Sequence, residues 1–228
     1  MDQVILQGIP FDADERGLME LLRIRPGTKN ASEFSSILAQ AKTLARPKAA
    51  FGIATARTVD HDAVEIDGIR FTSRVVRINL EKAGVVFPFV ATCGTELEDW
   101  SQGMTGMLHA FWADSLMLMA LGSAVGVLES HLKERLGGGA ALSTMNPGSL
   151  EDWPLGEQAA LFRLLGDATE AVGARLTDKM VIRPLKSVSG ISFVSEEGFT
   201  NCSLCPRQGC DSRRAPYDAG LYGKRYGL

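Results

Sequence analysis

The feature that most restricts the fold of this chain is a long apolar segment, residues 104–128, which is rich in Met, Leu, Ala and Gly. Large side chains such as Met107 and Phe111 recur there every three or four residues, which predicts a helix. We expect this helix to cover about residues 95–136, with a break near Gly103. A run of glycines follows directly and is typical of a helix end.

The same segment raises the question of a membrane span. His109 and Asp114 lie within it, and its uninterrupted apolar part, residues 115–128, is shorter than the ~20 residues that a spanning helix needs. The N-terminal residues also lack the basic and then apolar pattern of a secretory signal. The sequence therefore predicts a buried helix in a cytoplasmic protein, with no membrane segment and with reduced cysteines.

The remaining pattern consists of helices and grouped strands. Helices are expected at residues 11–25, 30–46, 73–82 and 152–173, and strands at 50–59, 63–71, 85–92, 179–183 and 188–195. A capping box at Asn30 and Glu33 is expected to open the second helix, and Ser73 is expected to cap the third. Asp67-Gly68 favours a tight hairpin turn, and Pro88 indicates a bulge or an edge strand. Without regular strand–helix alternation, this order predicts an α+β fold with a largely antiparallel sheet.

The composition limits the domain count and the class of partner. With 228 residues, of which 45% are hydrophobic, we expect one α+β domain over residues 1–200 and a cysteine-containing basic tail over 201–228. A net charge of -3 and a pI near 5.7 argue against nucleic-acid binding. The tail from residue 207 onward is locally basic, which suits either a solvated terminus or a docking surface for an acidic or phosphate-bearing partner.

Three cysteines lie within nine residues of the tail, at Cys202, Cys205 and Cys210. This spacing places soft sulfur ligands within reach of one ion, which suits an iron-sulfur cluster or zinc. The fourth ligand is Cys93, the one other cysteine, or His109. Cys93 has a second interpretation as an ordinary buried apolar residue.

Four segments of the second half occur in the order of a known family: ADSL from Ala113, HLKERL from His131, NPG from Asn146, and LTDKMVIRPLKSVSGISF from Leu176. With these motifs the chain resembles the reactivation domain of cobalamin-dependent methionine synthase over about residues 105–198. The resemblance implies a twisted antiparallel sheet with packed helices. It also implies S-adenosylmethionine binding and a corrinoid protein or corrinoid methyltransferase as the partner, so that the corrinoid is bound only through that partner.

At the positions that match the family's ligand-binding residues, this chain has residues of a different chemical type. An Arg and a Tyr of the family's PGY loop correspond to Thr144 and Ser149, and charged residues of its ADxL helix correspond to Ser115 and Leu118. Each lost charge-assisted contact costs ~1.5 to 3 kcal/mol, so the resemblance supports the fold more directly than S-adenosylmethionine binding. The candidate ligand-binding residues are Thr144, Pro147, Gly148, Ser149, Ser187 and Ser189.

The loop that follows, NPGSLEDWPL from Asn146, has two interpretations. In the first, Asp152 and Trp153 face a ligand other than S-adenosylmethionine. In the second, they belong to a turn that leads into a helix, and Trp153 packs in the core.

These features lead to three functional hypotheses. The first is an accessory protein of corrinoid-dependent methyl transfer that docks a corrinoid protein and delivers an electron through a cluster on the tail. The second is an S-adenosylmethionine-binding component of a methyltransferase. The third is a zinc-stabilised interaction module. No catalytic residue is assigned, because the chain has no nucleophile elbow, Walker loop or dinucleotide fingerprint.

Overall fold

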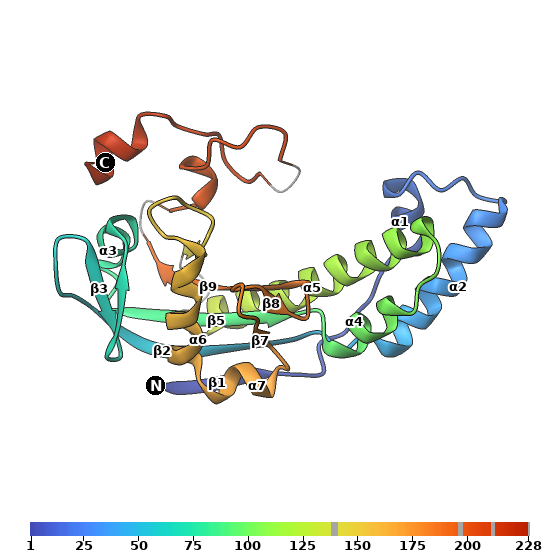
Figure 1. Cartoon of the computed structure of the whole chain (residues 1–228), viewed down its shortest axis with the longest axis horizontal. Helices are drawn as coiled ribbons and strands as arrows, with labels where there is room; N and C mark the ends of the chain where they lie inside the picture. The colour runs from blue at the N-terminus through green and yellow to red at the C-terminus, as the bar shows by residue number, and fades with distance from the viewer. Residues whose placement is uncertain (138–140, 196–197, 211–212, 228) are drawn as a thin grey trace.

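The computed structural model describes residues 1–137, 141–195, 198–210 and 213–227 (Figure 1). The strands are β1 Asp2–Leu6, β2 Lys48–Thr58, β3 Ala63–Ile66, β4 Ile69–Thr72, β5 Val85–Thr92, β6 Leu142–Met145, β7 Arg175–Leu176, β8 Ile182–Arg183 and β9 Ser187–Val194. The α-helices are α1 Glu15–Leu21, α2 Lys29–Leu44, α3 Arg74–Leu80, α4 Thr95–Gln102, α5 Met107–Arg135, α6 Gln158–Leu165 and α7 Asp167–Ala171. Short helical turns are η1 Leu155–Glu157, η2 Asn201–Ser203 and η3 Tyr222–Tyr226.

Seven strands form one antiparallel sheet in the order β4-β3-β2-β5-β9-β6, and β1 also pairs with β2. The centre of the sheet is β5, which pairs with β2 on one side and with β9 on the other. The other two strands, β7 and β8, form a separate pair. The predicted α+β class with a largely antiparallel sheet is confirmed.

Both faces of the sheet are covered by helices (Figure 1). Side chains alternate between the two faces of a strand. Phe51 on β2 belongs to a buried cluster with Leu128 of α5, whereas its neighbour Ala50 belongs to a second cluster with Leu161 of α6. The two clusters cover the two faces of the sheet, so its central strand β5 is also buried on both faces. For this reason β5 has an uninterrupted apolar sequence.

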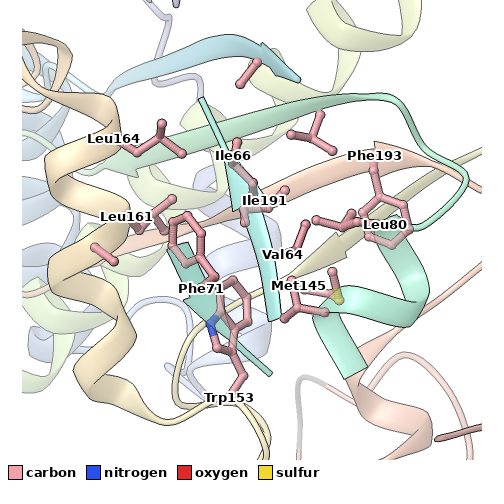
Figure 2. Close-up of a cluster of buried hydrophobic side chains, with 14 of the residues drawn as sticks. Val64, Ile66, Phe71, Leu80, Met145, Trp153, Leu161, Leu164, Ile191 and Phe193 are labelled. Atoms are coloured by element: carbon pink, nitrogen blue, oxygen red, sulfur yellow. The ribbon is translucent and has the colours of Figure 1, made fainter. Parts of the chain in front are cut away.

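The second cluster is the largest core and is drawn in Figure 2. It gathers side chains from β3, β4, α3, β6, α6 and β9, including the fully buried Trp153. Two residues of the tail, Leu204 and Tyr226, are 1% exposed and belong to the same cluster. The Tyr226 hydroxyl also accepts a hydrogen bond from Asn79 Nδ2 at 3.0 Å. These parts of the tail are therefore packed on the domain, and the interpretation of residues 207 onward as a solvated terminus does not hold for Tyr226.

The long apolar helix is α5, and its predicted break is confirmed by the separate helix α4, which ends at Gln102. By length and composition α5 is able to cross a membrane. In the structure Leu116, Ala120 and Leu128 pack in the interior, whereas Met107, Phe111 and Leu118 are exposed. The helix ends at Arg135, and Gly137 follows two residues later with a φ of 82°, which suits glycine. The next two glycines lie outside the described residues.

Local signals located several boundaries correctly. Asp67 and Gly68 form the turn between β3 and β4 with φ values of 43° and 83°, as a type I′ hairpin turn requires. Ser73 caps α3 by accepting a hydrogen bond from the Val76 N–H at 3.0 Å. The cap of α2 was predicted wrongly: Thr28 caps this helix through the Ala31 N–H at 3.3 Å. Glu33 instead forms an ion pair with Lys29.

Three expectations about strands and helices are corrected by tertiary contacts. Pro88 lies in the central strand without a bulge. The β2–β5 pairing is interrupted briefly at this residue, and its register is the same on both sides of the interruption. The helix expected at residues 152–173 is divided at Gly166, whose φ is 50°. Three further strands, β1, β6 and β7, were missed because each is short and is held by its pairing partner.

Candidate functional site

A polar cavity of about 240 Å³ lies between α5, strands β6 and β9, and the beginning of the tail. Its lining residues are Glu129, Lys133, Leu142, Thr144, Ser192, Phe199, Thr200 and Arg214. The cavity thus combines one carboxylate with two cationic side chains. Within the described part of the chain, these three charged side chains form no ion pair with one another or with another residue. A set of one carboxylate and two cationic groups suits a ligand that carries both signs of charge.

Thr144 is the predicted ligand-binding residue that the structure places in this cavity. It lies on β6 opposite Ser192 of β9, and the two hydroxyl oxygens are 3.0 Å apart. Thr200 at the start of the tail forms an isolated parallel bridge with Thr144. Three segments that are far apart in sequence therefore meet at this residue.

Pro147, Gly148 and Ser149 form a turn beside the cavity and do not line it. The Ser149 N–H donates to Asn146 O at 3.2 Å, and Gly148 has a φ of 79°. Proline followed by a glycine of positive φ is typical of a type II turn. The Gly148 N–H also donates to Trp153 O at 2.8 Å. In this structure these residues determine the path of the loop.

The two serines of the SVSG motif also have structural partners. Ser187 Oγ donates to Pro184 O at 2.7 Å and closes the turn before β9. Ser189 is 2% exposed, and its Oγ donates to Gln158 Oε1 at 3.1 Å. Gln158 Nε2 in turn donates to Met180 O at 2.7 Å. Buried polar groups need hydrogen-bond partners, and both serine hydroxyls have one in this structure.

A chain of hydrogen bonds links this motif to the cysteines of the tail. Asn146 Nδ2 donates to Ser189 O at 2.9 Å, and Asn201 Nδ2 donates to Asn146 Oδ1 at 3.2 Å. Asn201 directly precedes Cys202. The family-like loop, the SVSG strand and the cysteine tail are therefore one connected structure.

The cysteine loop, residues 202–210, is held together by the guanidinium group of Arg213. This group donates to Cys202 O at 3.0 Å, Cys205 O at 3.1 Å and Ala215 O at 3.2 Å, and also to Arg207 O. A planar group with five donors is suited to joining several carbonyl groups. Part of the basic charge of the tail therefore has an internal structural role.

The thiol of Cys202 has an altered environment. Partial burial acts to raise its pKa, but hydrogen bonds from the Arg214 backbone, the Thr200 side chain and the Ala215 backbone, together with the charge of Arg214, lower the pKa below the usual value. The bond from the Arg214 N–H to Cys202 Sγ measures 3.3 Å. A lowered pKa favours the thiolate, which is the nucleophilic and metal-binding form.

The sulfur atoms of the tail do not converge on one point. Among the described residues, the one set of three candidate metal ligands within 4.8 Å of one another is Asp60, His61 and Asp62, in an exposed turn. Since sulfur ligands bind zinc at about 2.3 Å, the three tail thiols as placed do not form a ready zinc or cluster site.

The structure does not bring the expected fourth ligands to the tail. Cys93 is fully buried in a third cluster with residues of α2, α4 and α5, and α2 and α4 lie at the end of the molecule opposite the C-terminus (Figure 1). Burial, followed by the nearby charge of Glu98, raises its pKa to about 12. His109 lies at the same end, where its ring stacks on Trp112 and its Nε2 is 3.0 Å from Glu33 Oε2. Cys93 is thus placed as a buried apolar residue.

Asp152 and Trp153 have structural roles instead of facing a ligand. Asp152 Oδ2 accepts hydrogen bonds from Ser73 Oγ and from the Val75 N–H, the latter at 2.8 Å, and so caps α3. Trp153 is fully buried and packs edge-on against Phe71 (Figure 2). The second interpretation of this loop is confirmed for Trp153.

Several lining residues were not predicted from the sequence. Glu129 and Lys133 were visible only as charges in the last turns of a helix, and Arg214 only as part of a basic tail. Ser192 and Thr200 carried no signal. What joins them is the pairing of β6 with β9 and the return of the tail to β6, which no local pattern encodes.

The fold and the cavity together define a class of protein: an α+β domain with a central antiparallel sheet and a charged cavity at the end of a long helix. A solved structure with this fold is the MetH reactivation domain bound to AdoHcy (S-adenosylhomocysteine). It matches with a TM-score of 0.61 and 14% identity over 88% of this chain and 80% of that chain. This likeness shows the fold and extends beyond residues 105–198. No protein-family model and no curated protein matches the chain.

Proposed function

We propose that this chain is an accessory protein of corrinoid-dependent methyl transfer and that its polar cavity binds the amino-acid end of an S-adenosyl compound. The observation that supports this most directly is the cavity itself, built on the family-like strands β6 and β9 of a fold shared with an AdoHcy-bound domain. The corrinoid belongs to the partner protein, where it supplies the methyl-transfer and redox chemistry. This chain supplies binding and positioning.

The charges of the cavity suit an amino-acid group. Glu129 is placed to attract an ammonium or sulfonium group, and Lys133 and Arg214 are placed to attract a carboxylate. Glu129 lies three helical turns beyond Leu118 on the same side of α5, so it restores a carboxylate to this helix. Arg214 similarly returns a guanidinium group to the cavity that Thr144 lines.

The volume of the cavity indicates which part of the ligand it holds. About 240 Å³ is below the ~300 to 1,000 Å³ of pockets that enclose drug-sized ligands. The amino-acid end fits such a space, and the adenosine is expected on the adjoining surface.

Calorimetry with AdoHcy tests this proposal. We expect one binding site, and Glu129→Gln is expected to weaken binding by about tenfold or more because it removes a charge-assisted contact. Glu134→Gln is the matched control, since Glu134 is an exposed carboxylate of the same helix outside the cavity. Absence of binding by the unaltered protein at millimolar AdoHcy would contradict the proposal, as would equal losses in the two variants.

The tail is the basis of a second, finer proposal: that Cys202, Cys205 and Cys210 bind an iron-sulfur cluster and deliver an electron to the corrinoid partner. It is supported by the density of thiols and by the lowered pKa of Cys202, and it requires the loop to close around the cluster. Metal analysis and an absorbance spectrum of anaerobically purified protein test it. Iron with visible absorbance is the expected result; zinc alone would favour the interaction module, and neither metal would refute both.

A further inference from the structure

Arg214 connects the polar cavity with the cysteine loop. Its side chain lines the cavity, while its backbone N–H donates to Cys202 Sγ at 3.3 Å. The preceding residue, Arg213, is fixed by its bonds to the carbonyl oxygens of Cys202 and Cys205. The position of the Arg214 guanidinium group therefore depends on the conformation of the loop and on the sulfur atom of Cys202.

The tail and the two residues that lead into it also form a large part of the cavity wall. Phe199 and Thr200 directly precede the tail, and Arg214 belongs to it. The Phe199 N–H donates to Ser143 Oγ at 2.6 Å, which attaches the start of the tail to β6. The cavity has two cationic side chains among the described residues. Lys133 is exposed on the last turn of α5, and the tail provides the other.

We propose that the cysteine tail completes the ligand site, that Arg214 is its carboxylate-binding residue, and that Cys202 holds Arg214 in position. This inference deepens the proposed binding of an S-adenosyl compound and rests on it, and it concerns the protein whose Cys202 thiol holds no metal or cluster. A group that blocks the Cys202 sulfur removes its hydrogen bond with the Arg214 N–H and is expected to weaken ligand binding. Bound ligand holds Arg214 in place, keeps this N–H on the sulfur and is expected to slow the modification of Cys202.

The first test compares variants by calorimetry with AdoHcy. Arg214→Ala is expected to weaken binding by about 10- to 100-fold, as for one charge-assisted contact. Arg207→Ala is the matched control, because Arg207 is exposed in the same loop and does not line the cavity. Cys202→Val removes the sulfur acceptor and is expected to weaken binding, whereas Cys202→Ser keeps an acceptor and is expected to retain most of it. Thermal unfolding of each variant identifies any that fail to fold.

The second test follows the reaction of Cys202 with iodoacetamide by mass spectrometry. Alkylation forms an S–C bond, releases the thiol proton and displaces iodide. AdoHcy is expected to slow this reaction in the unaltered protein and not in Arg214→Ala, with Cys210 as an internal control. If AdoHcy binds but Arg214→Ala binds it equally well, the inference is overturned and the proposed function stands.

The two ideas fail in distinguishable ways. If the unaltered protein does not bind AdoHcy, the proposed function fails, and inorganic phosphate then replaces AdoHcy as the anion in the alkylation test. Protection of Cys202 by phosphate that is lost in Arg214→Ala would still support the link between Arg214 and Cys202. Absence of protection by either anion would overturn it.

Discussion

Replacing Gly190 with alanine is expected to destabilise the protein by about 3 kcal/mol or more, because the position is overpacked. An added Cβ would lie 2.4 Å from Met145 O, 2.6 Å from Asn146 Nδ2 and 3.0 Å from Phe89 Cε1. The first of these atoms is backbone, so it cannot rotate away, and β6 would have to separate from β9. Urea unfolding measures the loss as a lower midpoint with an unchanged slope.

The same substitution is expected to damage the polar cavity. Thr144 precedes Met145 on β6, so a shift of this strand moves one wall of the cavity. Gly122→Ala serves as the control, because this glycine lies on the exposed face of α5 and a Cβ there meets nothing within 4 Å. That control should stabilise the helix by up to about 1 kcal/mol. A Gly190→Ala protein as stable as the unaltered one would contradict the close packing of β6 on β9.

Trp153→Ala is expected to cost about 3 to 5 kcal/mol, the range for truncating a buried aromatic side chain. Trp153 is fully buried, and its ring lies 6.4 Å from that of Phe71 at an interplanar angle of 73°. The truncation leaves a cavity between β4 and the loop before α6. Thermal or urea unfolding, together with the loss of buried-tryptophan fluorescence, measures the effect.

A second variant at this position tests a specific detail. The Trp153 Nε1–H is buried and has no hydrogen-bond partner among the described residues. An unsatisfied buried donor costs about 1 to 3 kcal/mol, so Trp153→Phe removes this cost while it loses part of the ring. We therefore expect Trp153→Phe to be destabilised by about 1 kcal/mol or less. A loss as large as that of Trp153→Ala would show that the indole N–H is satisfied, for example by a bound water molecule.

Local sequence signals predicted much of the secondary structure. The hairpin turn at Asp67-Gly68, the cap at Ser73 and the break near Gly103 all depend on the conformational preferences of a few neighbouring residues, and each is present in the structure. The grouping of strands also indicated the α+β class, because parallel sheets require a regular alternation of strands and helices. These features need no information about distant parts of the chain.

The errors share one physical cause. Pro88 lies in the central strand, since its missing N–H falls at a short interruption of the β2–β5 ladder while the pairing with β9 continues. Strand β6 was missed because its four residues are held by β9. Cys93 was considered as a fourth ligand because sequence spacing does not show that it lies in a different core from the tail.

By itself, the sequence determined the α+β class, the long internal helix and the presence of three thiols close together, because these follow from local periodicity and spacing. Only the tertiary structure decided what surrounds those thiols. It places Arg213 among the loop carbonyl groups, Arg214 between Cys202 and the cavity, and Cys93 in a different buried cluster from the tail. The physical reason is that strand pairing and the return of the tail to β6 join residues that are distant in sequence, and such long-range contacts leave no local pattern.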